Sequence, residues 1–171
     1  MSVRRFSILV FSTLLLIFLA STASNIWSLT RSNQSLDNVN REIRVVLSVI
    51  DPINHSRTMR VRAMEALEER EQGLNDKGQQ ALNGAQSVLE KANAAFQAYL
   101  EEPKQPGEQV LTDSYQNAFV NYREQGLQPL LDAVRANDIP RARALVTSTL
   151  PQLDKQFEVA LDKLLAFRQQ Y

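Results

Sequence analysis

The side chains best suited to bind or transform a ligand in this sequence are three arginines close together, Arg57, Arg60 and Arg62. No acidic residue lies between Ile53 and Arg62, so the segment is locally positive. The planar guanidinium group of arginine can bond both oxygens of a carboxylate at once. The cluster therefore indicates either a site for a carboxylate ligand or ion pairs with acidic residues of other helices. The residues alone leave both alternatives open.

The usual catalytic and metal-binding patterns are missing from the sequence. His55 is the only histidine and there is no cysteine, which excludes metal sites and triads built on several histidines, thiolate sites and disulfides. No phosphate-binding or dinucleotide-binding glycine motif occurs. The 19 basic and 19 acidic residues balance, whereas a nucleic-acid binder normally shows a basic excess. We expect no enzyme activity, no cofactor, no metal and no nucleic-acid partner.

An uncharged apolar segment at residues 6–27 predicts one transmembrane helix. In helical form it would be about 33 Å long, enough to cross the hydrocarbon core of a bilayer. Arg4 and Arg5 before it and Trp27 at its far end predict that residues 1–5 are cytoplasmic and residues 28–171 lie outside. The alternative is a signal peptide cleaved near Ala23. We favour the uncleaved anchor because a helical pattern continues directly after Trp27.

Apolar residues then recur at heptad spacing, which predicts a coiled-coil-like first helix that runs to about Gln72, with a bend at Pro52. The apolar positions are Leu29, Leu36, Ile43, Leu47, Ile50, Val61 and Met64. Asn54 and Arg57 occupy positions where this stripe would otherwise continue. Because an unpaired guanidinium is costly to bury, Arg57 needs a carboxylate, water or an anionic ligand.

The remaining sequence predicts an all-α, up-down-up-down four-helix bundle that continues from the transmembrane helix as one domain, residues 28–171. A turn is expected at Gly73 and at Asn75–Gly78. Asp138 is an expected N-cap, and Thr149 is expected to cap the last helix. The helices after the first are expected at 79–101, at 108–136 with a bend at Pro129, at 140–148, and from Pro151 onward.

Together these features resemble bacterial methyl-accepting chemotaxis receptors, in particular their four-helix periplasmic ligand-binding domain. The basic N-terminus, the membrane helix, the long amphipathic helix and the Ser56-Arg57 pair carry the resemblance. Within the family the chain looks most similar to the ribose-and-galactose receptor type, through residues 96–103, residues 126–131 and the run from Leu153 to Phe157. The resemblance implies a sensing domain in the periplasm, anchored in the bacterial inner membrane.

The resemblance also implies a ligand site at a homodimer interface formed by the first helix. In aspartate-type receptors three arginines of that helix contribute, and the first two correspond to Arg57 and Arg62, while the third position is Ala66. The missing arginine disfavours a dicarboxylate and favours a small monocarboxylate, including an aromatic acid. The candidate ligand-binding residues are Arg57, Arg62, Arg60 and Asn54, with Ser148, Thr149 and Gln152 on the wall formed by the last helix.

Receptors of this family also have a second membrane helix and a cytoplasmic signalling part, which this sequence is expected to lack. Two further hypotheses stay open. The tip of the bundle, near residues 75–78 and 136–141, would dock a periplasmic solute-binding protein, as sugar-sensing receptors of this type do. Alternatively, the chain is a membrane-tethered helical bundle without a ligand.

Overall fold

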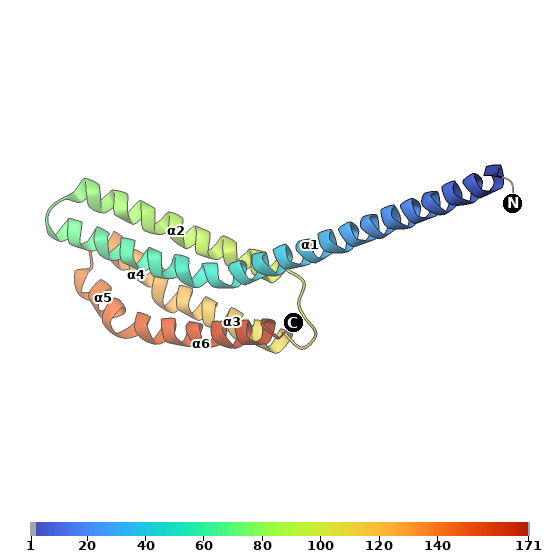
Figure 1. Ribbon diagram of the computed structural model, residues 1–171. Helices are drawn as coiled ribbons and strands as arrows, with labels where there is room; N and C mark the ends of the chain where they lie inside the picture. Colours follow the sequence, from blue (N-terminus) through green and yellow to red (C-terminus); the bar gives the residue numbers. More distant parts are fainter. Residues whose placement is uncertain (1–2, 171) are drawn as a thin grey trace. The chain divides into compact units, whose positions relative to one another are not determined.

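The computed structural model describes the backbone of residues 3–170 (Figure 1). Within these residues, helices joined by short connections are the only regular secondary structure. Side chains are described for residues 39–170 and, before these, for residues 21–22, 24, 27–33 and 36–37. The chain divides into two compact units, Met1–Arg44 and Val45–Tyr171. The elements are α1 Val3–Glu71, α2 Asn75–Glu101, α3 Gln109–Tyr122, η1 Arg123–Leu127, α4 Gln128–Arg135, α5 Ile139–Ala144, η2 Leu145–Thr149 and α6 Leu150–Arg168.

The first unit is the N-terminal part of α1. Its described apolar side chains at heptad positions, Leu29, Leu36 and Ile43, are all more than half exposed. Among the described residues, no helix has a stretch that is both long and apolar enough to cross a membrane. The span expected at residues 6–27 falls largely on side chains outside the described part and stays a prediction.

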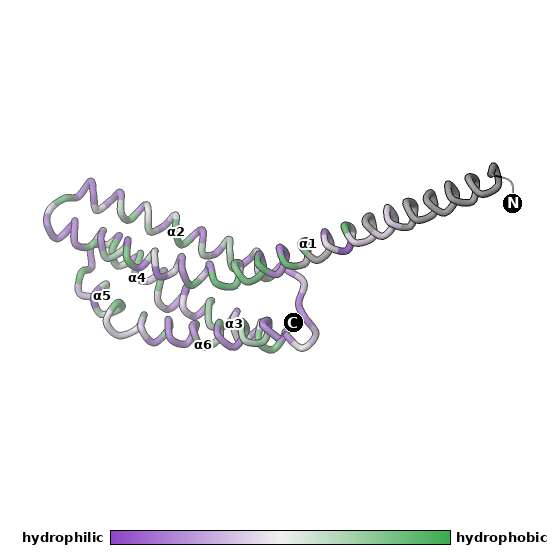
Figure 2. Tube along the Cα trace, in the orientation of Figure 1, coloured by the Kyte–Doolittle hydropathy of each residue, from purple (hydrophilic) through white to green (hydrophobic). Residues whose placement is uncertain are grey.

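The second unit is a helical bundle, which confirms the all-α architecture expected from the sequence. Its four arms are α1, α2, the α3–η1–α4 run and the α5–η2–α6 run (Figure 1). Hydrophobic and hydrophilic residues alternate along the arms at helical spacing (Figure 2). A cluster of aromatic rings fills the centre, with the rings of Phe96 and Phe119 stacked at 4.3 Å and Tyr99 edge-on to Tyr115 at 5.2 Å. The Tyr115 hydroxyl donates to the carbonyl of Val49 and so ties α3 to α1.

The turn between α1 and α2 is shorter than the sequence predicted. Residues 75–78, expected to be a turn, form the first turn of α2 instead, and the chain reverses over residues 72–74. Asp76 favours this start because an acidic side chain complements the positive end of the helix dipole. Gly78 is buried, and a Cβ there would lie 2.6 Å from Cγ of Arg70, so this glycine serves the close approach of two helices.

Wide π-helical turns lie just before two prolines, where the sequence predicted a bend at Pro129 and the start of a new helix at Pro151. The turn η1 ends two residues before Pro129, and η2 ends two residues before Pro151. Proline cannot donate to the carbonyl four residues back and its ring crowds that carbonyl, so a wider turn just before it relieves the conflict without ending the helix. The prediction that Thr149 caps a new helix is therefore wrong, since Thr149 is helical and makes no capping bond. Asp138 does cap α5, because its carboxylate accepts from the Arg141 amide.

A buried ion pair joins the start of α3 to the end of α6. The Arg168 guanidinium donates twice to the Glu108 carboxylate, with both N···O distances 2.9 Å. Both side chains are almost fully buried, at 2% and 0% exposed. Glu108 also accepts from the Tyr99 hydroxyl and the Gln105 amide, so its carboxylate is fully satisfied. Burial of the phenol, the largest cause, raises the pKa of Tyr99 above its ordinary range.

Replacing Gly126 by alanine should destabilise the bundle by about 1–3 kcal/mol, the usual cost of overpacking a core. The added Cβ would lie 2.7 Å from Cδ2 of Leu150 and 3.1 Å from Cδ1 of Leu153, both buried. Urea unfolding of the full chain in mild detergent, followed by circular dichroism, measures the change. The matched control is Gly84→Ala, where the new Cβ meets only the movable Arg62 side chain at 3.3 Å. That variant should gain up to about 1 kcal/mol from helix propensity. Equal effects of the two substitutions would contradict tight packing of η1 against α6.

Replacing Arg168 by methionine should lower the free energy of unfolding by about 3–5 kcal/mol, because Glu108 would keep a buried, uncompensated charge. The control is Arg143→Met, which removes an ion pair to Glu71 in which the arginine side chain is 62% exposed. Exposed pairs contribute less than about 1 kcal/mol. The same unfolding experiment compares the two variants, and similar losses would show that the Arg168–Glu108 pair adds no more than a surface pair.

Candidate functional site

The Arg57 guanidinium on α1 is bound by acidic residues of α6. Its Nε lies 3.1 Å from Oδ1 of Asp154 and its Nη2 lies 3.0 Å from Oδ2, a two-pronged pair across the bundle. Nη2 also lies 3.3 Å from Glu158 Oε1. The hydrogen bond to Asp154 is the main cause that raises the pKa of Arg57. Of the two alternatives that the sequence left open for Arg57, the ion pair with another helix is the one present in this structure.

The Asp154 carboxylate joins three arms of the bundle. Besides Arg57, its Oδ1 accepts from the Tyr122 hydroxyl of α3 at 3.1 Å. The Asp154 side chain is 16% exposed, while that of Arg57 is 40% exposed. Burial is the main cause that raises the pKa of the Tyr122 phenol, so this hydroxyl stays protonated and donates. Asp154 is thus held in place by a buried donor on one side and faces a partly exposed cation on the other.

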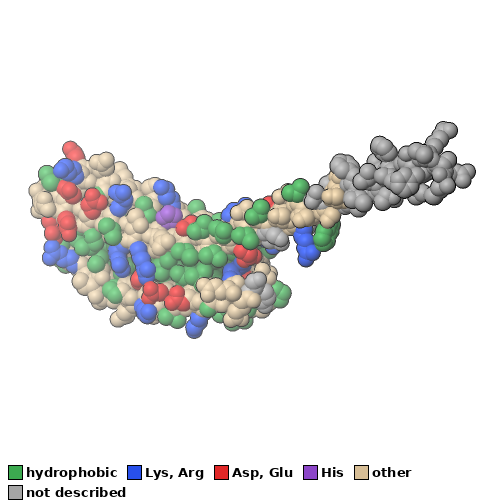
Figure 3. Space-filling model, in the orientation of Figure 1, with side chains coloured by type: hydrophobic (Ala, Val, Ile, Leu, Met, Phe, Trp, Pro, Cys, Tyr) green, Lys and Arg blue, Asp and Glu red, His purple; other side chains and the backbone are tan. Residues whose placement is uncertain are grey.

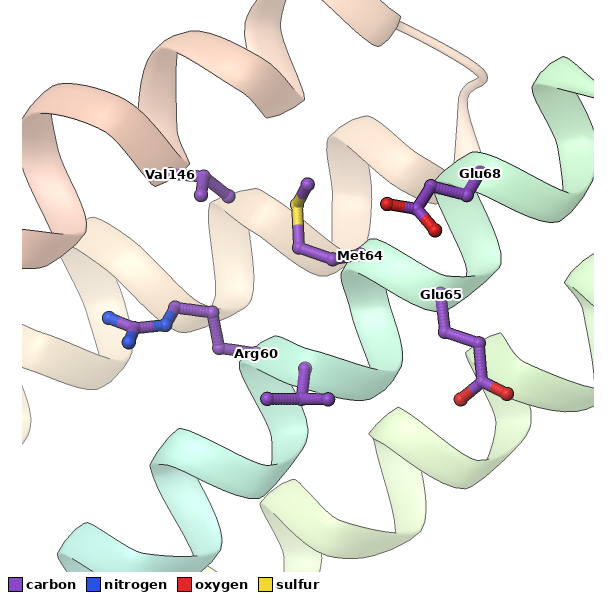
Figure 4. Close-up of a pocket in the computed structure, with 6 residues that line it drawn as sticks. Arg60, Met64, Glu65, Glu68 and Val146 are labelled. Atoms are coloured by element: carbon purple, nitrogen blue, oxygen red, sulfur yellow. The ribbon is translucent and has the colours of Figure 1, made fainter.

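Arg60 lies one turn further along α1 and has no such partner. Its side chain is partly buried and makes no ion pair among the side chains described for residues 39–170. It lies at one end of an open hollow of about 410 Å³. In the view of Figure 4, Val146 lies at the same end as Arg60, Met64 lies in the middle, and Glu65 and Glu68 lie at the other end. Val61 completes the lining, so one cation, an apolar middle and two carboxylates follow one another along α1.

Arg62 lies on a different side of α1. Its Cδ is the atom nearest to a Cβ placed on Gly84 of α2, at 3.3 Å, and its guanidinium is 4.0 Å from Glu65. Five residues of helix turn the chain by about 500°, which places Arg57 and Arg62 about 140° apart. A single copy of the chain therefore does not bring Arg57 and Arg62 together. Asn54 is exposed on the face between them.

The expected wall of the last helix also faces elsewhere. Ser148, Thr149 and Gln152 line an open groove of about 290 Å³ with residues of α3 and η1. Gln152 precedes Asp154 by two residues, or about 200° of helix, so it projects away from Arg57. Within one copy of the chain these three residues do not share a site with the arginines.

Exposed apolar side chains lie on α1 beside the arginines. Leu47 and Val61 are 50% and 65% exposed at positions fourteen residues apart, with Asn54 halfway between them. In Figure 3 hydrophobic side chains gather on the face between α1 and α6, and basic and acidic side chains meet across it. This surface is suited to a ligand or partner that has apolar groups and one carboxylate. Among the described residues, no group of three His, Cys, Asp or Glu is arranged to hold a metal ion.

Sequence reasoning missed several residues of this region. Asp154, Tyr122, Met64 and Val146 were not among the candidate residues, although Asp154 belongs to a segment that carried the family resemblance. Asp154 and Glu158 are four residues apart, so they share one face of α6. A search for acidic pairs of this spacing opposite the arginines would have found them.

Comparison with known proteins identifies the family of the whole chain. A family model described as "Tar ligand binding domain homologue" matches residues 1–171, the whole chain. No curated protein and no solved structure matches the chain. The family is one of sensory domains and is not known as enzymatic. The chain therefore belongs to the family of Tar ligand-binding domain homologues and is a chemoreceptor ligand-binding sensory domain.

Proposed function

We propose that this sensory domain detects a small carboxylate with an apolar body, bound beside Arg60 in the hollow along α1. The observation that supports it is the state of Arg60, a partly buried guanidinium that makes no ion pair among the side chains described for residues 39–170 and lies at the end of an apolar hollow. A cation held near apolar surface binds carboxylates more strongly than one in bulk water, because the effective dielectric constant is lower.

The other residues of the hollow favour a particular kind of acid. Met64, Val61 and Val146 offer contacts to an apolar group. Glu65 and Glu68 at the far end repel a second carboxylate but attract an ammonium group. The arrangement therefore favours a monocarboxylate, such as an aromatic acid or an apolar amino acid, over a dicarboxylate. This preference agrees with the absence of a third arginine at Ala66.

A homodimer through α1 would complete the site. The exposed stripe with Leu47 and Val61 lies between the sides of α1 that carry Arg57 and Arg62. A second copy on this stripe would bring Arg62 of the partner subunit towards Arg57 and Arg60, and Asn54 would lie in the interface. The anchor at residues 6–27, in the bacterial inner membrane with the bundle in the periplasm, would hold two copies side by side.

A thermal-shift panel of acetate, benzoate, phenylalanine and succinate, on the full chain in mild detergent, tests the proposal. Benzoate and phenylalanine should raise the melting temperature more than acetate or succinate. A ligand at 100 times its dissociation constant stabilises the fold by about 2.7 kcal/mol. Arg60→Ala should remove the shift because it removes the free cation.

The control is Arg135→Ala, which deletes an exposed arginine that pairs with Asp132 away from the hollow and should leave the shift intact. A shift that survives Arg60→Ala would place the carboxylate elsewhere. No shift with any acid, together with a solute-binding protein retained from periplasmic extract, would favour docking at the tip. There, residues 73–77 line an open hollow and Leu74 is 40% exposed. Failure of both assays would leave the tethered bundle without a ligand.

A further inference from the structure

We infer that Asp154 is an internal competitor for the carboxylate ligand: it occupies the Arg57 guanidinium, and a ligand gains Arg57 only by displacing it. This inference rests on the proposed function, because it concerns the same carboxylate site. The Asp154 carboxylate of the chain thereby influences how tightly a ligand carboxylate binds.

Asp154 contacts Arg57 in the same way as a bound carboxylate ligand would. Arg57 uses Nε and Nη2 on the two oxygens of Asp154, the two-pronged arrangement by which arginine holds any carboxylate. A carboxylate ligand that approaches Arg57 would need these same two donors. Glu158 adds only one contact, at 3.3 Å, from a side chain that is 35% exposed.

The surroundings keep the free-energy cost of displacing Asp154 from Arg57 low. Arg57 is 40% exposed, so a ligand can reach it from solvent. Asp154 keeps the Tyr122 hydroxyl as a hydrogen-bond donor when Arg57 is withdrawn, so its carboxylate is not left without a partner. Glu158 is held by Lys155 at 3.0 Å and keeps this partner as well. Lys155, the main cause, and Arg57 hold the pKa of Glu158 below its usual value, so it stays ionised.

The exchange has a consequence for the fold. The Arg57–Asp154 pair is a direct tie between α1 and α6, two arms that are far apart in sequence. A ligand that takes Arg57 breaks that tie and leaves Asp154 on α6 bound to α3 through Tyr122. Ligand binding is thereby coupled to whether α6 is held by α1, and the coupling equals the difference in binding free energy between the two arrangements.

The test is the dissociation constant of benzoate, measured by isothermal titration calorimetry on the full chain in mild detergent. Asp154→Asn keeps the shape of the side chain and a hydrogen-bond acceptor for Tyr122 but removes the competing charge. It should bind benzoate on the order of tenfold more tightly, the scale of one charge-assisted pair at a partly exposed position. The charge-matched control is Asp162→Asn, an exposed acid of the same helix, which should leave the constant unchanged.

A second variant covers the case in which Asp154→Asn does not fold. Tyr122→Phe removes the hydroxyl that Asp154 keeps when Arg57 is withdrawn. Displacing Asp154 then leaves its carboxylate without this donor, so benzoate binding should weaken without a change of charge. Adding Arg57→Gln to Asp154→Asn should cancel the gain, because the released guanidinium is then missing.

The outcomes separate this inference from the proposed function. If Arg60-dependent binding is present but Asp154→Asn does not strengthen it, Asp154 is no competitor and the proposed function stands. If only the Asp154→Asn variant binds benzoate, the competition is real and the natural chain is not a benzoate sensor. If neither protein binds benzoate, freeing Arg57 creates no carboxylate site and the inference is wrong, while the panel of acids decides the proposed function independently.

Discussion

One constraint governs the second unit: α1 is covered by the bundle on one side only. Val45, Val49 and Ile53 face the core and are at most 2% exposed, whereas Leu47 and Val61 on the other side are at least half exposed. Burying apolar surface stabilises a fold by about 25 cal/mol per Å², so an uncovered apolar stripe is a surface from which a partner or ligand gains free energy. The arginines lie along the edges of this stripe, where one charged group can meet solvent and apolar surface together.

The centre of the bundle, in contrast, is closely packed and buried. The aromatic cluster and the buried Glu108–Arg168 pair fix α2, α3 and α6 relative to one another, and the Glu108 carboxylate accepts from Arg168, from the Tyr99 hydroxyl and from the Gln105 amide. The ion pairs that join Arg57 of α1 to α6 are partly exposed, and they are therefore weaker than the buried Glu108–Arg168 pair. A domain that must respond to a ligand needs such a contrast, because a ligand shifts only those contacts whose free energy is comparable to its own differential binding.

Much of the fold could be predicted from the sequence because its signals are local. The 3.6-residue spacing of apolar side chains predicted the helices, and Asp138 was recognisable as a cap from its position before Pro140. The errors arose where a single residue has two physical roles. Gly78 was interpreted as a turn residue but serves helix packing, and Pro151 was interpreted as a helix start but follows a wide turn in a continuing helix. Choosing between such roles requires the neighbouring helix, which the local sequence does not contain.

The site was less predictable for a related reason. The spacing of Arg57, Arg60 and Arg62 identifies a positive cluster, but it does not say which guanidinium already has a partner. That depends on Asp154, 97 residues away, and on the helical phase that turns Asp154 towards α1 and Gln152 away from it. Hence the arginine that most resembles the family's ligand-binding position is the one that is paired, while its neighbour Arg60 makes no ion pair among the side chains described for residues 39–170. If a ligand carboxylate and a carboxylate of the chain compete for one guanidinium, the affinity for the ligand depends on the difference between their two free energies of interaction with it. Residues that stabilise the internal pair can then change the affinity without touching the ligand.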